Sequence, residues 1–125
     1  MQYVSKRKQM VKCTFMKPAI SYPDFEKLDI RVGTVVDCES PDWSKKLLRL
    51  EVDFGEFGKR IIFSGIKQWY SPDEFVGKQF PFLVNLEPKK MGEEESQGMM
   101  LAADVEGKPI LLHPEAKIPE GSIVR

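Results

Sequence analysis

The chain has 125 residues, enough for one domain that buries about two thirds of the surface its unfolded chain exposes. Hydrophobic residues make up 42% of the sequence and charged residues 30%, which is typical of a globular protein and excludes a disordered tail or a coiled coil. The longest apolar runs have four or five residues, whereas a membrane-spanning helix needs about 20. Two cysteines are too few for a disulfide scaffold. No apolar stretch of a secretory signal follows the basic N-terminus, so we expect a cytoplasmic protein without a membrane association.

The charges are unevenly distributed along the chain. Nineteen Lys and Arg residues balance nineteen Asp and Glu residues, but residues 1–20 carry five basic groups and no acidic one. Residues 21–125 therefore carry 14 basic and 19 acidic groups, a balance of −5. The basic surface typical of a nucleic-acid-binding domain is absent over this part of the chain. Binding to RNA would need a local cluster of cations.

The first 23 residues are expected to form a basic N-terminal arm. They show no hydrophobic period, and Pro18 and Pro23 interrupt them. Met16 is an alternative start, so residues 1–15 need not contribute to the fold. We expect the folded domain to span residues 24–125.

Three strands are predicted in the first half of this domain. Residues 30–38 are rich in β-branched side chains, which favour a strand. Residues 47–54 alternate between apolar and charged side chains, which is typical of a strand with one buried face. A turn at residues 55–58 closes a hairpin into the third strand, residues 59–64.

A short helix is predicted next, at residues 71–77. Ser71 can cap its first turn, Pro72 suits the first helical position, and Glu74 completes a capping box. Gly77 can end the helix. This segment therefore separates the third strand from the strands that follow.

The rest of the chain contains further strands and turns. Residues 79–86 alternate again, and Pro81 places the start of this strand at an edge or a bulge. The remaining segments are a polar loop at 88–98 with three consecutive glutamates, a hairpin of residues 99–105 and 109–112, and a tail at 114–125. The small size and closely spaced turns favour an all-β barrel. A helix between the third and fourth strands is typical of a five-stranded OB-fold barrel, here with a C-terminal extension.

The sequence gives little support to an enzyme. Its one histidine, His113, adjoins Pro114 and has no recognisable nucleophile as a companion. Cys13, Cys38 and His113 do not make a closed zinc site, which needs four ligands. The glycines form no phosphate-binding loop. We therefore expect no catalytic residues, no metal and no cofactor.

Five segments, in order, resemble the tRNA-binding domain family. They are Asp29-Ile30-Arg31-Val32-Gly33, Ser64-Gly65-Ile66, Tyr70-Ser71-Pro72-Asp73-Glu74 with Val76-Gly77-Lys78, residues 84–91 (VNLEPKKM), and residues 96–103 (SQGMMLAA). The resemblance covers about residues 25–125. It implies an OB-fold and a non-catalytic protein that recognises the shape and backbone of tRNA. It also implies a homodimer and possible assistance, in trans, to a methionyl-tRNA synthetase.

A second branch of the same family consists of secretion-related chaperones. Residues 24–31 (DFEKLDIR) resemble the start of that branch. Binding of unfolded polypeptide therefore remains the alternative function.

An OB barrel binds nucleic acid across its second and third strands and the loops beside them. Cations there would bind phosphates, and hydroxyl and amide groups would bind sugars and base edges. The candidate tRNA-binding residues are Lys45, Lys46, Arg49, Lys59, Arg60, Ser64, Lys67, Asn85, Lys89, Lys90, Ser96, Gln97 and Met99.

Alternatives stay open at several positions. Met99 suits a contact with a base or a place in the core, and Asn85 can instead fix a loop by bonding to backbone. Trp43, Trp69 and Tyr70 are candidate stacking groups, although the two tryptophans are also suited to packing against the barrel or a second subunit. Members of the family often have an arginine shortly before the Ser-Gln-Gly-Met segment. Here that arginine is missing and residues 93–95 are glutamates, so we expect this loop to bind phosphate weakly.

Overall fold

The computed structural model describes residues 15–125. The basic residues Lys6, Arg7, Lys8 and Lys12 of the predicted arm, together with Cys13, lie outside the described residues. A one-turn helix, α1 (Tyr22–Phe25), which the sequence pattern does not predict, spans the expected boundary between the arm and the domain at residues 23 and 24. Ser21 caps this turn by accepting a hydrogen bond from the Asp24 backbone N–H, and Pro23 suits the first turn of a helix.

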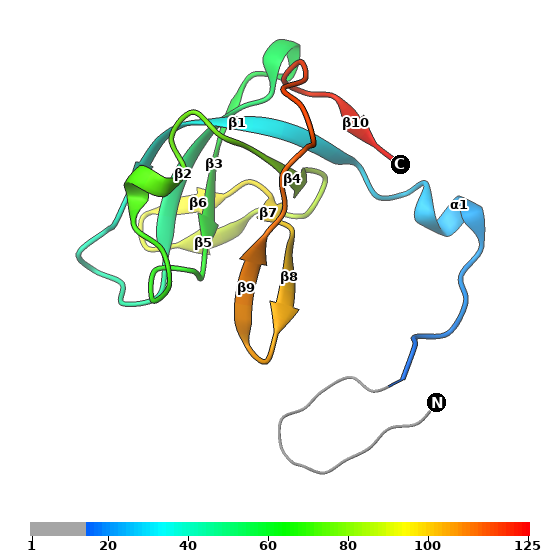
Figure 1. Cartoon of the computed structure of the whole chain (residues 1–125), viewed down its shortest axis with the longest axis horizontal. Coiled ribbons are helices and arrows are strands. Elements are labelled where there is room, and N and C mark those ends of the chain that lie inside the picture. Colours follow the sequence, from blue (N-terminus) through cyan, green and yellow to red (C-terminus); the bar gives the residue numbers. More distant parts are fainter. Residues whose placement is uncertain (1–14) are drawn as a thin grey trace.

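Five antiparallel strands form the nearly closed barrel, in the order β3-β2-β1-β4-β7 (Figure 1). Their bounds are β1 (Ile30–Glu39), β2 (Leu48–Asp53), β3 (Lys59–Ser64), β4 (Gln79–Leu83) and β7 (Met99–Met100). The barrel closes between Gln97 and Ile61, where the Gln97 N–H donates to the Ile61 carbonyl at 2.8 Å. The Ile61 N–H in turn donates to Oε1 of Gln97 at 2.9 Å. The predicted all-β, OB-like barrel is confirmed.

Two single turns of 3-10 helix connect the strands. η1 (Gly55–Phe57) joins β2 to β3, and η2 (Pro72–Glu74) lies between β3 and β4, where the sequence predicts a short helix. The Ser71 N–H donates to the Glu74 carboxylate at 2.8 Å, which is half of the predicted capping box.

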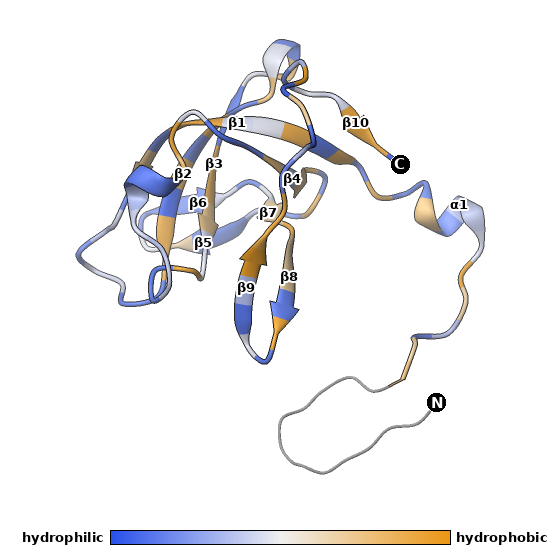
Figure 2. Ribbon diagram, in the orientation of Figure 1, coloured by the Kyte–Doolittle hydropathy of each residue, from blue (hydrophilic) through white to orange (hydrophobic). Residues whose placement is uncertain are grey.

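The core follows from the alternation of side chains. Leu48, Leu50 and Val52 point inward from β2 and are fully buried, while the residues between them face outward. Figure 2 shows this alternation of hydrophobic and hydrophilic residues along the barrel strands. The rings of Phe54 and Phe82 pack edge to face at 5.5 Å. Each large side chain buried in this way contributes about 1.5–3 kcal/mol.

Residues 88–98 are not the loop that the sequence predicts. They form a hairpin of β5 (Lys89–Met91) and β6 (Glu94–Ser96), in which Lys90 pairs with Glu95. Gly92 has a φ of +63°, which permits the tight turn between the two strands. The sequence does not predict these strands because most of their side chains are polar and face solvent, so the strands show no alternation of apolar and polar residues.

The predicted strand 99–105 is divided in two. Met99 and Met100 pair with β4, whereas β8 (Ala102–Val105) leaves the barrel and pairs with β9 (Lys108–Leu111). Pairing with β4 stops because the Leu101 N–H bonds to the Pro81 carbonyl at 3.0 Å, and Pro81 has no N–H to return the bond. The hairpin of β8 and β9 therefore projects from the barrel (Figure 1).

The C-terminal extension returns to the barrel. The Gly121 N–H donates to the Val32 carbonyl at 2.8 Å, and the Val32 N–H donates to the Ser122 carbonyl at 2.9 Å. The last strand, β10 (Ile123–Val124), then pairs with the start of β1. Within residues 15–125, none of the helices has the length and apolarity needed to cross a bilayer.

Candidate nucleic-acid interface

The outer face of β2 and β3 is bordered by two segments. One is the loop between β1 and β2, residues 40–47, referred to below as the 40–47 loop. The other is the β5–β6 hairpin, residues 89–96. Arg49 on β2 lies opposite Phe63 on β3, and Phe63 is buried. This arrangement corresponds to the surface that OB barrels use for oligonucleotides.

Trp43 brings the two bordering segments together. Its ring centroid lies 5.8 Å from that of Phe63, and 56% of the residue remains exposed. The same ring lies against Gly92 so closely that a Cβ atom at that position would stand 3.0 Å from it. The 40–47 loop therefore contacts the turn of the β5–β6 hairpin through Trp43, in agreement with a packing role for this tryptophan.

Five of the candidate cations are exposed lysines: Lys45, Lys46, Lys59, Lys89 and Lys90. Among the described residues none of their ammonium groups has an ion-pair or hydrogen-bond partner. Four of them lie within three residues of Trp43 or Gly92 in the chain, on the two segments that this contact joins. Lys59 begins β3 at the other end of this face.

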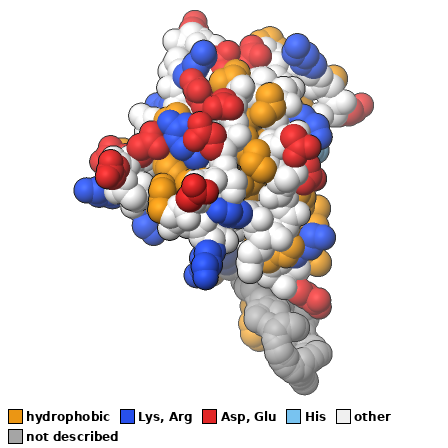
Figure 3. All heavy atoms as spheres, turned by 90° about the vertical axis from the view of Figure 1, so that its left-hand side faces the viewer, with side chains coloured by type: hydrophobic (Ala, Val, Ile, Leu, Met, Phe, Trp, Pro, Cys, Tyr) orange, Lys and Arg blue, Asp and Glu red, His pale blue; other side chains and the backbone are white. Residues whose placement is uncertain are grey.

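The surrounding surface is of mixed charge. Figure 3 shows the side of the molecule that contains the 40–47 loop, with Lys and Arg side chains interspersed among Asp and Glu. A local group of lysines, and no continuous basic patch, is therefore what this face offers to a polyanion.

Arg49 is already paired. Its Nε and Nη2 bind the two carboxylate oxygens of Glu94 at 2.7 and 2.8 Å, and Glu39 stands at 3.9 Å. The hydrogen bond from Arg49 lowers the pKa of Glu94, and the bond to Glu94 raises the pKa of Arg49. Sequence reasoning missed Glu94 as a partner because it lies 45 residues away, in a segment predicted as a loop.

Two other candidate cations hold the structure together. Arg60 donates from Nη1 to the carbonyls of Val84 at 2.6 Å and Gln97 at 3.2 Å. Lys67 donates from Nζ to the carbonyls of Pro41, at 2.8 Å, and Ser44. Lys67 therefore fixes the conformation of the 40–47 loop, and Arg60 joins β3 to the segments beside it.

Most of the polar candidates bond to backbone. The Ser96 hydroxyl is buried, accepts from the Phe63 N–H at 3.0 Å and donates to the Gly98 carbonyl. Asn85 accepts from the Asp29 N–H at 2.9 Å and donates to the Lys27 carbonyl at 2.6 Å. Gln97 closes the barrel as described above. These amide and hydroxyl groups have structural partners already.

The remaining two candidates differ in exposure. Ser64 is half-buried at the end of β3, opposite Leu48. Met99 is 44% exposed, whereas its neighbour Met100 is buried and fills the core position. Met99 is thus available at the surface.

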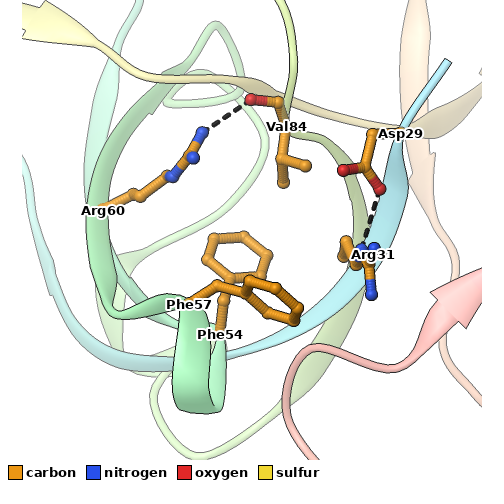
Figure 4. Close-up of a pocket in the computed structure, with 6 residues that line it drawn as sticks. All are labelled: Asp29, Arg31, Phe54, Phe57, Arg60 and Val84. Carbon is orange, nitrogen blue, oxygen red and sulfur yellow. Dashed lines mark hydrogen bonds and ion pairs between the residues drawn. The ribbon is translucent and has the colours of Figure 1, made fainter. Parts of the chain in front are cut away.

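A small pocket of about 50 Å³ lies at one end of the barrel (Figure 4). In this view the rings of Phe54 and Phe57 lie below Val84, with Arg60 on one side and Asp29 and Arg31 on the other.

Arg31 lies 4.6 Å from the Phe57 ring centroid and binds Asp29 at 2.8 Å and the Gly121 carbonyl at 3.1 Å. Because both arginines of this pocket bond to the protein, they connect strand ends and offer no open anion site.

The histidine and the described cysteine, His113 and Cys38, do not belong to this face. His113 places Nδ1 3.1 Å from the Gln79 carbonyl, and its ring centroid is 4.8 Å from that of Phe80. Burial, followed by the nearby Asp37 and Glu39 charges, raises the pKa of the Cys38 thiol to about 12. A thiol with this pKa is not an available nucleophile at neutral pH. Over residues 15–125, no three His, Cys, Asp or Glu side chains gather as a metal site would require.

Comparisons with known proteins agree with one another. The family model described as "Putative tRNA binding domain" matches residues 30–123. The chain is 49% identical over 109 residues to the methionine–tRNA ligase of Methanothrix thermoacetophila, covering 87% of this chain and 16% of that protein. It is 48% identical over 107 residues to the methionine–tRNA ligase of Porphyromonas gingivalis, covering 85% and 16%. The chain thus spans about a sixth of the length of these relatives.

Solved structures give a similar result. A MetRS-related protein from Pyrococcus horikoshii matches with a TM-score of 0.82 and 38% identity, covering 87% of this chain and 100% of that one. The chaperone CsaA from Bacillus anthracis matches with a TM-score of 0.77 and 31% identity, covering 86% and 100%.

Proposed function

The chain belongs to the tRNA-binding domain family, and from this premise we propose that it binds tRNA, without catalysis, on the face between the 40–47 loop and the β5–β6 hairpin. The observation that carries this assignment is the set of lysines on the two segments joined by the Trp43–Gly92 contact, which have no partner within residues 15–125. Their ammonium groups are free to bind phosphates. Lys45, Lys46, Lys89 and Lys90 supply the principal contacts, with Lys59 and Met99 at the border.

The same geometry favours recognition of shape and backbone over base sequence. Reading bases requires free donors and acceptors that reach base edges. Here the side chains of Asn85, Ser96 and Gln97 are engaged with backbone groups of the barrel. Arg60 and Lys67 act as positioning residues for the same surface. We therefore propose that the lysines recognise the arrangement of phosphates on a folded tRNA.

A binding titration tests this proposal. Bulk tRNA, a duplex RNA of the same length and DNA are titrated at two salt concentrations, and we expect tRNA to bind most tightly. Lys46→Ala should weaken tRNA binding and reduce the slope of log K against log salt by about one, because one phosphate contact is lost.

The matched control is Lys117→Ala, since Lys117 is an exposed lysine in the segment between β9 and β10. Equal effects of the two substitutions, or equal binding of all three nucleic acids, would contradict the proposed site.

We further propose that two copies pair through the side of the barrel opposite the lysines. Figure 1 shows α1 and β10 on one side of the molecule and the 40–47 loop on the other. Tyr22, Leu28, Ile123 and Val124 are all at least 40% exposed there. Symmetric pairing would cover these apolar side chains and double the surface available to one tRNA.

The similarity to methionine–tRNA ligases suggests which enzyme would use the bound tRNA. We propose that the domain increases the supply of tRNA to a methionyl-tRNA synthetase in trans. The expected result is a lower KM for tRNA when the domain is added to such an enzyme, and an unchanged KM would contradict it.

The second candidate function is binding of unfolded polypeptide. The similarity to chaperone CsaA and the net charge of −5 over residues 21–125 favour it. A competition assay separates the two functions. If a denatured polypeptide binds tightly and tRNA fails to displace it, the chaperone function is supported and the tRNA site is not.

A further inference from the structure

The ion pair between Arg49 and Glu94 occupies the centre of the proposed tRNA-binding face. Arg49 projects outward from β2 beside Phe63, and Glu94 reaches it from the β5–β6 hairpin. Both carboxylate oxygens are used, at 2.7 and 2.8 Å. This is the fork-shaped pairing by which an arginine also binds a phosphate group. Glu94 therefore stands where an RNA phosphate would meet Arg49.

Resting on the proposed function, we propose that Glu94 is a built-in competitor of the RNA, which holds Arg49 out of the binding surface and thereby sets its affinity for tRNA. A phosphate that reaches Arg49 must displace the carboxylate, so that one anion is exchanged for another. The net gain in attraction is small. Only an RNA that also contacts the lysines of the 40–47 loop and the β5–β6 hairpin then binds tightly.

The pair is suited to such an exchange. The Arg49 side chain keeps 22% and the Glu94 side chain 45% of its surface exposed. A pair that is partly open to solvent can be approached by a second anion and is screened by salt. Glu39, at 3.9 Å, is the second carboxylate near the guanidinium and keeps the local charge negative. One of the three consecutive glutamates at 93–95 thus has a defined role, since Glu94 neutralises Arg49.

Removing the Glu94 charge tests the inference. Glu94→Gln keeps the size of the side chain but releases the guanidinium for a phosphate. We expect tRNA affinity to rise about five- to tenfold at about 0.1 M salt, and the slope of log K against log salt to steepen by about one, as one added phosphate contact requires. Arg49→Met should abolish the gain, so that the chain with both Arg49→Met and Glu94→Gln binds tRNA no more tightly than the unaltered chain.

The matched control is Glu93→Gln, because Glu93 precedes Glu94 in the turn of the same hairpin and, among the described residues, pairs with no cation. It changes the net charge equally, and we expect less than about a twofold gain. Equal gains from the two substitutions would overturn the inference while leaving tRNA binding in place. If neither the unaltered chain nor the variants bind tRNA, the proposed function fails, and the inference fails with it.

Discussion

The cationic side chains of this barrel fall into two groups. Lys45, Lys46, Lys89 and Lys90 are exposed and unpaired among the described residues, whereas Arg49, Arg60 and Lys67 bind carboxylate or carbonyl oxygens of the protein. Residue type alone does not separate them, because the division depends on what the fold places beside each charge. Only the first group has its full charge available for an RNA phosphate.

The pH dependence of the Arg49–Glu94 pair is predictable in direction. Arg49 lowers the pKa of Glu94 in the folded protein. The pair therefore stabilises the fold above the ordinary pKa of glutamate, and this contribution disappears as the pH falls through the folded-state value. We expect Arg49→Met to raise the pKa of the Glu94 carboxyl, as measured by NMR titration of its side-chain carbon. An unchanged titration would mean that the pair does not form in solution.

Much of the site could be predicted at the level of residue type, but its pairing could not. Lys89 and Lys90 lie in a segment that resembles the family, and the lysines of the 40–47 loop follow from the usual binding face of an OB barrel. The partner of Arg49 is 45 residues away and lies in a segment whose strands are polar and exposed. No local pattern of hydrophobic residues indicates how such a segment folds back.

At the level of the elements, the strands with a buried face were predictable and the exposed ones were not. The alternation of residues 47–54 fixes which side chains of β2 enter the core, and the structure places that strand at Leu48–Asp53. The β5–β6 hairpin has no such alternation, since it is exposed to solvent. Its position depends instead on the turn at Gly92 and the contact with Trp43.

Gly33 of β1 is expected to be essential to the barrel. A Cβ atom at this position would stand 2.4 Å from Cγ1 of Val52 and 2.7 Å from Cε1 of Phe54. Gly33→Ala should therefore lower the free energy of unfolding by about 1–3 kcal/mol, measured by chemical denaturation.

Gly65 provides the control, because a Cβ atom there meets nothing within 4 Å. Gly65→Ala should leave the unfolding midpoint close to that of the unaltered chain. Equal stability of the two variants would show that the packing between β1 and β2 is looser than described.

For the whole molecule, the proposed dimer separates two surfaces of different chemistry. The 40–47 loop, which contains Lys45 and Lys46, lies on one side, and α1 and β10, which carry exposed apolar residues, lie on the other (Figure 1). We expect Val124→Asp to shift the sedimentation coefficient from that of a dimer to that of a monomer, because a carboxylate would be buried in the interface.

Val76→Asp is the matched control, since Val76 is 48% exposed and follows η2 on the barrel. A monomeric unaltered chain, or dissociation caused by both substitutions, would contradict the proposed interface.

The most direct test of the central claim is an NMR titration of the labelled chain with tRNA, followed at the backbone amides. We expect shifts and line broadening to concentrate in residues 40–47 and 89–96, together with the indole N–H of Trp43. Amides of β8 and β9 should keep their positions. Changes confined to β8, β9 and the C-terminal extension, with the 40–47 loop unaffected, would contradict the proposed binding face.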